Sequence, residues 1–256
     1  MARFKGRVAL ITGAAGGIGR AIALTLAKDG ADIGIVDTSA DGAEAVAGEV
    51  RALGRRAAGI AGDVASGASI KAAASAIEAT LGPIDMLVNN AGIARIGKLL
   101  EVPEQDWHDS FAVNVDGVFN TSRAVMPGMI ARKRGTVVNL ASWLGKRGAA
   151  NYGVYAATKF AVIGFTQSLA YEMAPHGIRV NSVCPGLIVE TTMRRVIDEE
   201  SAKRGLPKSN DRAPTIPMGR VGYPDEVARV VAFLCSDEAS YVTGAAYDIT
   251  GGSWMS

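Results

Sequence analysis

Three residue types that can together move a proton lie within the segment 142–159, SWLGKRGAANYGVYAATK. Tyr155 and Lys159 are four residues apart, so a helix would project both side chains from one face. A free tyrosine, with a pKa of about 10, is a poor acid–base catalyst at neutral pH, but a nearby ammonium favours the phenolate. We therefore expect Lys159 to lower the pKa of Tyr155. Tyr155 would exchange a proton with a substrate oxygen, to which Ser142 donates a hydrogen bond.

A buried strand and a helix are expected to hold these residues. Residues 135–142, GTVVNLAS, have the β-branched apolar character of a buried strand, which would leave Ser142 at its carboxyl end. From Tyr155 onward, apolar residues recur at helical spacing with no proline before Pro175, which predicts a helix. The alternative is structural, because an aromatic residue often packs beside a lysine at this spacing. Taken alone, the spacing favours that alternative.

A glycine-rich turn follows the first predicted strand, residues 8–11. It reads TGAAGGIG over residues 12–19 and leads into a predicted helix that ends near Gly30. Glycines there let a pyrophosphate approach the amide groups at a helix N-terminus. Gly13, Gly17 and Gly19 follow G-x3-G-x-G, which differs from the G-x-G-x-x-G dinucleotide motif. A purely structural turn is the alternative, but the position after the first strand favours phosphate binding.

The second predicted strand, residues 31–36, is followed by Asp37. A carboxylate there can accept hydrogen bonds from the adenosine ribose hydroxyls and would repel a 2′-phosphate. The next residues, Thr38 and Ser39, bring no positive charge. Asp37 therefore favours NAD over NADP. The alternative is that it caps the following helix.

The remaining sequence continues the alternation of strands and helices, which predicts a parallel sheet. Ligands bind at the carboxyl ends of such strands, and the candidate residues fall there: Gly13, Asp37, Asp63, Asn90, Ser142 and Pro185. A helix predicted from Glu104 past Met126 carries Asn114, whose amide needs a partner if buried: a backbone carbonyl, a water or a catalytic group. Residues 187–217 are predicted to form a mobile lid over the substrate.

Composition limits the classes of protein that this chain can represent. Its 256 residues are 48% hydrophobic, which suits one α/β domain over residues 1–256. The net charge of +2 comes without a basic tract, which argues against nucleic-acid or membrane-surface binding. The two cysteines and two histidines are scattered, so we expect neither a disulfide framework nor a metal site. We also expect a soluble, cytoplasmic protein, because no signal peptide or membrane-length apolar stretch is present.

Taken jointly and in this order, the motifs resemble those of the short-chain dehydrogenase/reductase family over essentially the whole chain. They are TGAAGGIG at 12–19, DV at 63–64, NNAG at 89–92, Asn114, Ser142, YAATK at 155–159 and PG at 185–186. The resemblance implies a Rossmann-like, doubly wound, seven-stranded parallel sheet with helices on both faces, a three-layer αβα fold. It also implies a homotetramer.

The resemblance further implies a catalytic set of Asn114, Ser142, Tyr155 and Lys159, in which Asn114 holds a water that links Lys159 to solvent. The cofactor contacts that it implies are Gly13, Ala15, Gly17, Ile18, Gly19, Asp37, Asp63, Val64, Asn90, Ala91, Gly92, Tyr155, Lys159, Pro185, Gly186, Ile188 and Thr191. One departure concerns the last of these. The family pattern P-G-x-x-x-T is one residue longer here, PGLIVET, which leaves open whether Thr191 contacts the cofactor.

The function expected from these residues is NAD-dependent interconversion of a secondary alcohol and its ketone. Residues 151–170 and the C-terminal GGSWMS resemble bacterial polyol and diol dehydrogenases of the sorbitol and butanediol type. A 3-oxoacyl-thioester reductase of the same family is one alternative, and Asp37 counts against it because those reductases mostly use NADPH. A non-catalytic dinucleotide sensor is the other, and an intact proton-transfer set counts against that.

Overall fold

The computed structural model describes residues 3–255 and is built on a parallel sheet. Its seven strands have the order β3-β2-β1-β4-β5-β6-β7, and every neighbouring pair is parallel. The strands are β1 (Val8–Thr12), β2 (Asp32–Asp37), β3 (Ala57–Ala61), β4 (Ile84–Asn89), β5 (Gly135–Leu140), β6 (Ile178–Pro185) and β7 (Ala246–Ile249). The order reverses direction between β1 and β4, which is the doubly wound arrangement that the sequence predicts.

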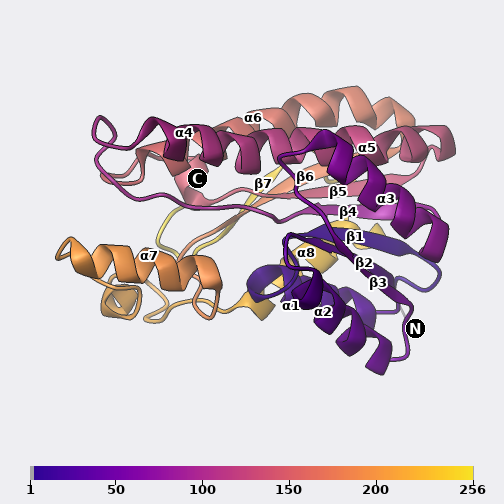
Figure 1. Cartoon of the computed structure of the whole chain (residues 1–256), viewed down its shortest axis with the longest axis horizontal. Coiled ribbons are helices and arrows are strands. Elements are labelled where there is room, and N and C mark those ends of the chain that lie inside the picture. The colour runs from indigo at the N-terminus through magenta and orange to yellow at the C-terminus, as the bar shows by residue number, and fades with distance from the viewer. Residues whose placement is uncertain (1–2, 256) are drawn as a thin grey trace.

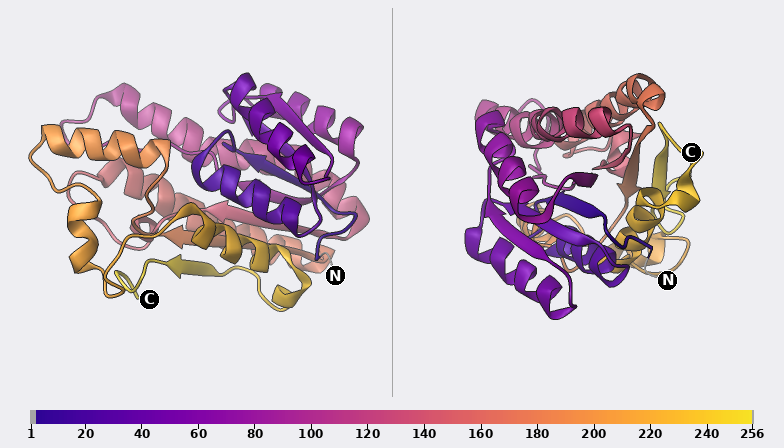
Figure 2. Two further views of the ribbon diagram at one scale, coloured as in Figure 1. Left: turned by 90° about the horizontal axis from the view of Figure 1, so that it is seen from below. Right: turned by 90° about the vertical axis from the view of Figure 1, so that its right-hand side faces the viewer.

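Helices cover both faces of the sheet (Figures 1 and 2). One face carries α1 (Gly17–Lys28), α2 (Ala40–Ala52) and α8 (Pro224–Cys235). The other carries α3 (Gly67–Leu81), α4 (Glu104–Phe111), α5 (Gly117–Arg132) and α6 (Gly153–Met173). The expected three-layer Rossmann-like fold is therefore confirmed. Within residues 3–255, no helix is both long and apolar enough to cross a membrane.

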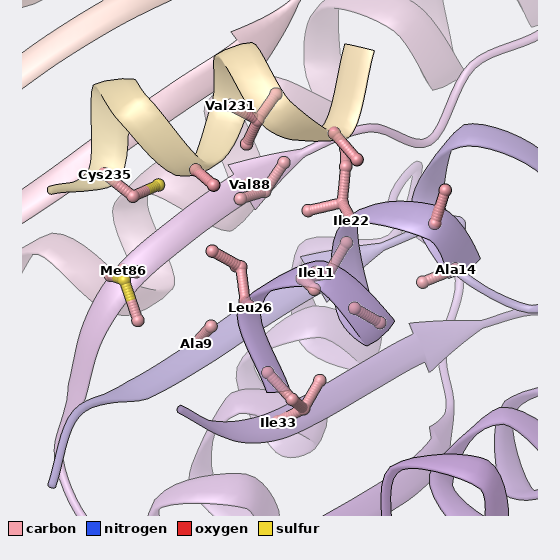
Figure 3. Packing of buried hydrophobic residues seen from close by; sticks show 14 of the residues in the cluster. Ala9, Ile11, Ala14, Ile22, Leu26, Ile33, Met86, Val88, Val231 and Cys235 are labelled. Atoms are coloured by element: carbon pink, nitrogen blue, oxygen red, sulfur yellow. The ribbon is translucent and has the colours of Figure 1, made fainter. Parts of the chain in front are cut away.

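Burial on both faces explains why the central strands are continuous apolar runs. Figure 3 shows Ile11 of β1 and Val88 of β4 in one cluster with Leu26 of α1 and Val231 of α8. All four side chains are fully buried. The edge strand β3 is only partly covered, which accounts for its weak sequence pattern, AAGIA.

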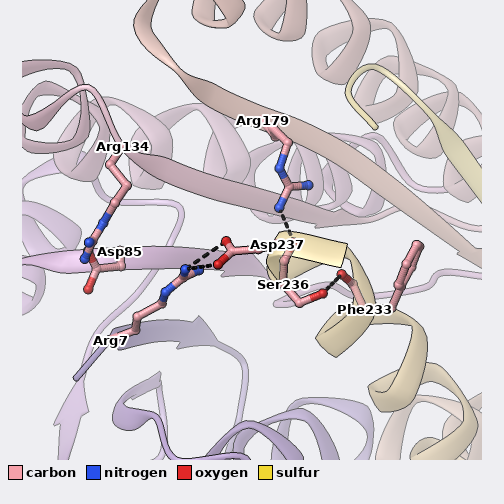
Figure 4. Close-up of polar contacts among 7 residues, drawn as sticks. All are labelled: Arg7, Asp85, Arg134, Arg179, Phe233, Ser236 and Asp237. Atoms are coloured by element: carbon pink, nitrogen blue, oxygen red, sulfur yellow. Dashed lines mark hydrogen bonds and ion pairs between the residues drawn. The ribbon is translucent and has the colours of Figure 1, made fainter. Parts of the chain in front are cut away.

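Ion pairs and hydrogen bonds lie at the amino ends of the central strands (Figure 4). Arg7, just before β1, donates to both carboxylate oxygens of Asp237 at 2.8 and 2.7 Å. Arg134, just before β5, binds Asp85 at 2.6 Å. Arg179 of β6 donates to the Ser236 carbonyl at 2.8 Å. Structural polar contacts thus occupy this end of the sheet, and the candidate site residues gather at the opposite, carboxyl end.

Two segments differ locally from the predicted elements. The helix expected from Glu104 past Met126 is interrupted by a π-helical turn, Ala112–Asp116, between α4 and α5. Such turns are rare and often mark functional sites, and this one carries Asn114. Within the expected lid, α7 (Thr192–Lys203) is followed by a short 3-10 helix, Asn210–Thr215. Figure 1 shows this segment standing off from the sheet, beyond its carboxyl end.

Candidate active site

A cavity of about 620 Å³ opens at the carboxyl ends of the strands. All but two of the predicted site residues line it: Gly13, Ala15, Gly17, Ile18, Asp37, Asp63, Val64, Asn90, Ala91, Gly92, Ser142, Tyr155, Lys159, Pro185, Gly186, Ile188 and Thr191. The other two contact lining residues: Gly19 packs against Gly13 and Asn90, and Asn114 lies beside Gly92. The fold therefore brings the proposed catalytic and cofactor-binding residues to one place.

The unit formed by β5 and α6 brings Ser142, Tyr155 and Lys159 together. Ser142 follows β5, and its hydroxyl accepts a hydrogen bond from the Leu144 amide at 3.2 Å and also hydrogen-bonds the Tyr155 phenol. Lys159 is 3% exposed, and its Nζ donates to the Leu140 carbonyl at 2.7 Å. The same Nζ lies 5.6 Å from the centroid of the Tyr155 ring. One phenol, one hydroxyl and one buried ammonium thus share a single corner of the cavity.

Burial has a larger effect than the lysine charge on the pKa values of Tyr155 and Lys159. Burial raises the pKa of Tyr155 above its ordinary value of 10, against the lowering effects of the Ser142 hydrogen bond and the Arg194 charge. Burial also lowers the pKa of Lys159 from 10.5 to about 8. The expectation that Lys159 lowers the pKa of Tyr155 in the free protein is therefore wrong. The physical reason is that desolvation disfavours both the phenolate and the ammonium.

Asn114 connects the segment after β4 to α6, the helix that carries Tyr155 and Lys159. Its Nδ2 donates to the Ile93 carbonyl at 2.9 Å and to the Thr158 hydroxyl at 3.0 Å, and its Oδ1 accepts the Ile93 amide at 2.8 Å. The side chain has no exposed surface, and the partners that the sequence left open are a backbone segment and a hydroxyl of α6. Its expected role of holding a water stays a prediction.

The glycine-rich turn has no room for side chains at two of its glycines. A Cβ on Gly13 would lie 2.7 Å from the Ala91 Cα, and a Cβ on Gly19 would lie 2.5 Å from the Gly13 carbonyl oxygen. The Asn90 side chain fixes the turn, because its Nδ2 donates to the carbonyls of Thr12 and Gly13 at 3.0 and 2.8 Å. These contacts leave the turn and the N-terminus of α1 open to the cavity, which is the arrangement that a pyrophosphate requires.

Replacing Gly19 with alanine is expected to disrupt this turn. The new methyl group would also lie 2.6 Å from the Asn90 Nδ2, and overpacking of this kind costs about 1–3 kcal/mol. We expect a lower midpoint of thermal unfolding and weaker NADH binding, measured by calorimetry and fluorescence titration. Gly16→Ala is the control for unfolding, because a Cβ there meets no atom within 4 Å. Equal unfolding midpoints for the two variants would contradict the packing argument.

Asp37 bridges the end of β2 to the glycine-rich turn. Its Oδ2 accepts the Ala15 amide at 3.0 Å, and its Oδ1 accepts the Ser39 amide at 3.0 Å. The cap of α2 is Ser39, whose hydroxyl accepts the Gly42 amide. The alternative in which Asp37 caps that helix is therefore wrong. The carboxylate lies at the cavity wall beside Thr38 and Ser39, with no basic side chain among the lining residues at this end.

Asp63 and Val64 form the cavity wall beyond β3. The Asp63 Oδ1 accepts the Ala65 amide at 2.9 Å, which shapes the turn before α3. The Val64 carbonyl accepts a hydrogen bond from the Asn120 Nδ2 at 2.9 Å. This contact joins the turn to α5, on the same face of the sheet.

In the segment after Pro185-Gly186, which is one residue longer than the family pattern, the backbone at Glu190 has a φ of +58°. This left-handed conformation precedes Thr191, which caps α7 by accepting the Arg194 amide at 3.0 Å. Thr191 still reaches the glycine-rich turn, since a Cβ on Gly17 would lie 3.2 Å from the Thr191 Cβ. Contact between Thr191 and the cofactor stays a prediction.

Comparison with known proteins agrees with this geometry. Residues 7–202 match the family model described as short chain dehydrogenase. The chain belongs to the short-chain dehydrogenase family. It is 41% identical to the 3-oxoacyl-(acyl-carrier-protein) reductase FabG of Escherichia coli over 252 residues, covering 98% of this chain and 99% of that protein. It is also 43% identical to the Escherichia coli oxidoreductase UcpA over 259 residues, covering 100% of this chain and 97% of the relative.

Two solved structures share the fold of this short-chain dehydrogenase closely. Levodione reductase superposes with a TM-score of 0.93 at 35% identity, covering 98% of each chain. NAD⁺-bound xylitol dehydrogenase superposes with the same TM-score at 34% identity, covering 98% of this chain and 100% of that one. The chain is therefore an oxidoreductase of this family, and the predicted family resemblance is confirmed.

Among the further residues of the short-chain dehydrogenase that line the cavity, five with large side chains were not predicted from the sequence: Trp143, Tyr152, Met193, Arg194 and Ile197. Trp143 follows Ser142 directly, and the last three lie in the first turns of α7. Only their proximity to a motif could have indicated them, because none occupies a position whose spacing implies chemistry. Among residues 3–255, no group of three His, Cys, Asp or Glu side chains could hold a metal ion.

Proposed function

We propose that this short-chain dehydrogenase interconverts a secondary alcohol, such as a polyol, sugar alcohol or small diol, and its ketone with NAD as cofactor. The observation that carries the proposal is the meeting of Ser142, Tyr155 and Lys159 in the same cavity as the glycine-rich turn and Asp37. The glycine-rich turn fits a dinucleotide, because close packing behind Gly13 and Gly19 leaves the backbone of the turn and the N-terminus of α1 facing the cavity. The nicotinamide, when bound, supplies the hydride acceptor.

In this proposal, the residues of the chain hold the substrate and move one proton. The Ser142 hydroxyl donates a hydrogen bond to the substrate oxygen, and Tyr155 takes the hydroxyl proton during oxidation or returns it during reduction. Burial raises the pKa of Tyr155, so the phenolate needs positive charge nearby, which the Lys159 ammonium would supply. Asn114 would hold a water that returns the proton to solvent. The buried setting strengthens each of these interactions relative to water.

The segment 187–217 would act as a lid on the proposed single domain, residues 1–256. Its helix α7 stands away from the sheet (Figure 1), while Thr191, Met193 and Arg194 line the cavity. Movement of this helix would control entry of the substrate. Residues 1, 2 and 256 lie outside the described part of the chain. Assembly as a homotetramer and a cytoplasmic location are further proposals, which rest on the family resemblance and the composition.

A 3-oxoacyl-thioester reductase is the second candidate function, and the similarity to FabG favours it. A screen separates the two: polyols and small diols with NAD, and 3-oxoacyl thioesters with NADH and NADPH. We expect NAD reduction by at least one neutral or charged polyol at a higher kcat/KM than any thioester supports. Faster thioester reduction with NADPH would establish the second candidate. Cofactor binding without any turnover would favour a non-catalytic sensor.

Replacing Asp37 with alanine should narrow the preference for NAD over NADP. In the wild type, the Asp37 carboxylate would lose its ribose hydrogen bonds when NADP replaces NAD, and it would repel the 2′-phosphate. A tenfold change in preference corresponds to only about 1.4 kcal/mol. We expect the ratio of kcat/KM with NAD to kcat/KM with NADP to fall by about tenfold or more. Adding Thr38→Arg should lower it further by pairing with the phosphate.

The control for this experiment is Ser39→Ala, which removes the α2 cap and keeps the carboxylate. We expect it to lower the unfolding midpoint, since loss of a cap costs about 1 kcal/mol, while the cofactor ratio stays near that of the wild type. An unchanged cofactor ratio in Asp37→Ala would refute the assignment of Asp37 to the ribose.

A further inference from the structure

Four residues that line the cavity carry charged side chains: Asp37, Asp63, Lys159 and Arg194. Three of them already have backbone partners. The two carboxylates accept amide groups, and Lys159 donates to a carbonyl. Arg194 differs, because its guanidinium makes no ion pair or side-chain hydrogen bond within residues 3–255.

The Arg194 side chain is half-buried, and one of its nitrogens lacks a partner. Its Nε is buried without a hydrogen-bond partner, and leaving a charged donor unsatisfied costs more than a hydrogen bond contributes. The neighbouring acidic side chains of α7 do not satisfy it. Asp198 binds the amide and hydroxyl of Ser209 at 3.1 and 2.7 Å, and Glu199 pairs with Arg195 at 2.9 Å.

The first turn of α7 places Arg194 at the catalytic end of the cavity. A Cβ built on Gly92 would lie 3.6 Å from the Lys159 Nζ and 3.7 Å from the Met193 Cε, so Met193, which precedes Arg194, and the buried lysine both lie close to Gly92. The Arg194 charge also reaches the Tyr155 phenol, whose acidity it increases. The other end of the cavity, at Asp37 and Asp63, carries negative charge.

We infer that Arg194 is a specificity-determining residue that binds a carboxylate on the substrate, so that the preferred substrate is a hydroxy acid such as an aldonate. This inference rests on the proposed function, because it names the substrate class of the same site. A guanidinium has a planar fork of donors that matches a carboxylate. One carboxylate would give the buried Nε its partner and compensate the charge.

Matched substrates in which a neutral group replaces the carboxylate test this inference. Gluconate and sorbitol form one pair, and 3-hydroxybutyrate and 3-hydroxybutyramide form the second, each as both enantiomers where they exist. Two quantities are measured on the whole protein: kcat/KM with NAD, and the dissociation constant of each compound from the NADH complex by titration calorimetry. The second measurement does not require turnover.

We expect the acid of at least one pair to bind more tightly and to react faster than its neutral partner. Arg194→Met should reduce that selectivity by about 10- to 100-fold, the effect of losing a charge-assisted hydrogen bond pair. Arg194→Lys should restore part of it, because it keeps the charge without the planar fork. The control is Arg195→Met, which removes an exposed arginine one residue away and should keep the selectivity of the wild type.

Three outcomes would overturn the inference: neutral compounds preferred in both pairs by the wild type, equal losses in Arg194→Met and Arg195→Met, or weaker NADH binding by Arg194→Met with the acid selectivity intact. The last would assign Arg194 to a cofactor phosphate. Failure of the proposed function looks different. In that case no compound reduces NAD, although an acid still binds in a manner that depends on Arg194.

Discussion

Replacing Tyr155 with phenylalanine is expected to lower kcat by about 10²- to 10⁴-fold, the usual contribution of a positioned acid–base group. The substitution removes only the phenol oxygen, and the ring that packs beside Lys159 remains. NADH affinity should therefore stay close to that of the wild type. Steady-state kinetics and a fluorescence titration of NADH measure the two quantities on the same preparation.

Tyr152→Phe is the matched control, because this second tyrosine also lines the cavity and loses the same atom. We expect a much smaller effect on kcat than in Tyr155→Phe. Equal losses in the two variants would mean that neither phenol has a specific role. Wild-type turnover in Tyr155→Phe would rule out the proposed proton transfer.

Lys159→Met is expected to lower kcat by at least about 100-fold and to weaken NADH binding. The first effect follows from losing the charge that supports the Tyr155 phenolate, whose pKa burial raises. The second follows from the cofactor contact that the family resemblance implies for Lys159. A change confined to the substrate KM would contradict both roles.

The same variant also tests the electrostatics of the folded protein. Burial lowers the pKa of Lys159 from 10.5 to about 8. Between these values the unfolded chain holds a proton that the native protein has released, so native stability gains from this residue as pH rises through that range. The methionine variant lacks this gain. The free energy of unfolding of the variant minus that of the wild type should therefore fall by roughly 2 kcal/mol between about pH 7 and pH 9.5.

The difference in free energy of unfolding between variant and wild type isolates the contribution of Lys159 from those of other groups that titrate at similar pH. Cys184 and Cys235, whose pKa values burial raises to about 11, have the opposite slope but are present in both proteins. The Leu140 carbonyl loses its partner in the variant at every pH. This loss changes the free energy of unfolding by an amount that does not depend on pH. A difference independent of pH would show that the Lys159 pKa is not lowered.

The sequence predicted the fold well because its signals come from backbone geometry and burial. Apolar runs bounded by glycine and proline mark the strands, and their alternation with helices determines that the sheet is parallel. The π-helical turn at Ala112–Asp116 was missed because its residues continue an apolar pattern that also fits an α-helix. The left-handed Glu190 was missed because a non-glycine residue gives no local sign of that conformation.

The proximity of Ser142, Tyr155 and Lys159 could be predicted, because a short motif places them on one strand and the helix that follows. The acidity of Tyr155 was predicted with the wrong sign, because burial depends on what the rest of the chain packs around the phenol. Arg194 was missed for a similar reason. Its position in the cavity depends on how α7 folds back over Gly92, which no local spacing encodes.

Hydride transfer from a carbinol carbon is tested most directly by isotope tracing. The purified wild-type protein is incubated with NAD and a sugar alcohol or hydroxy acid that carries deuterium on the reacting carbon, and the NADH formed is analysed by mass spectrometry. Transfer of the hydride as proposed predicts NADH that carries one deuterium, together with the corresponding ketone. Unlabelled NADH, or deuterium released to water, would contradict it.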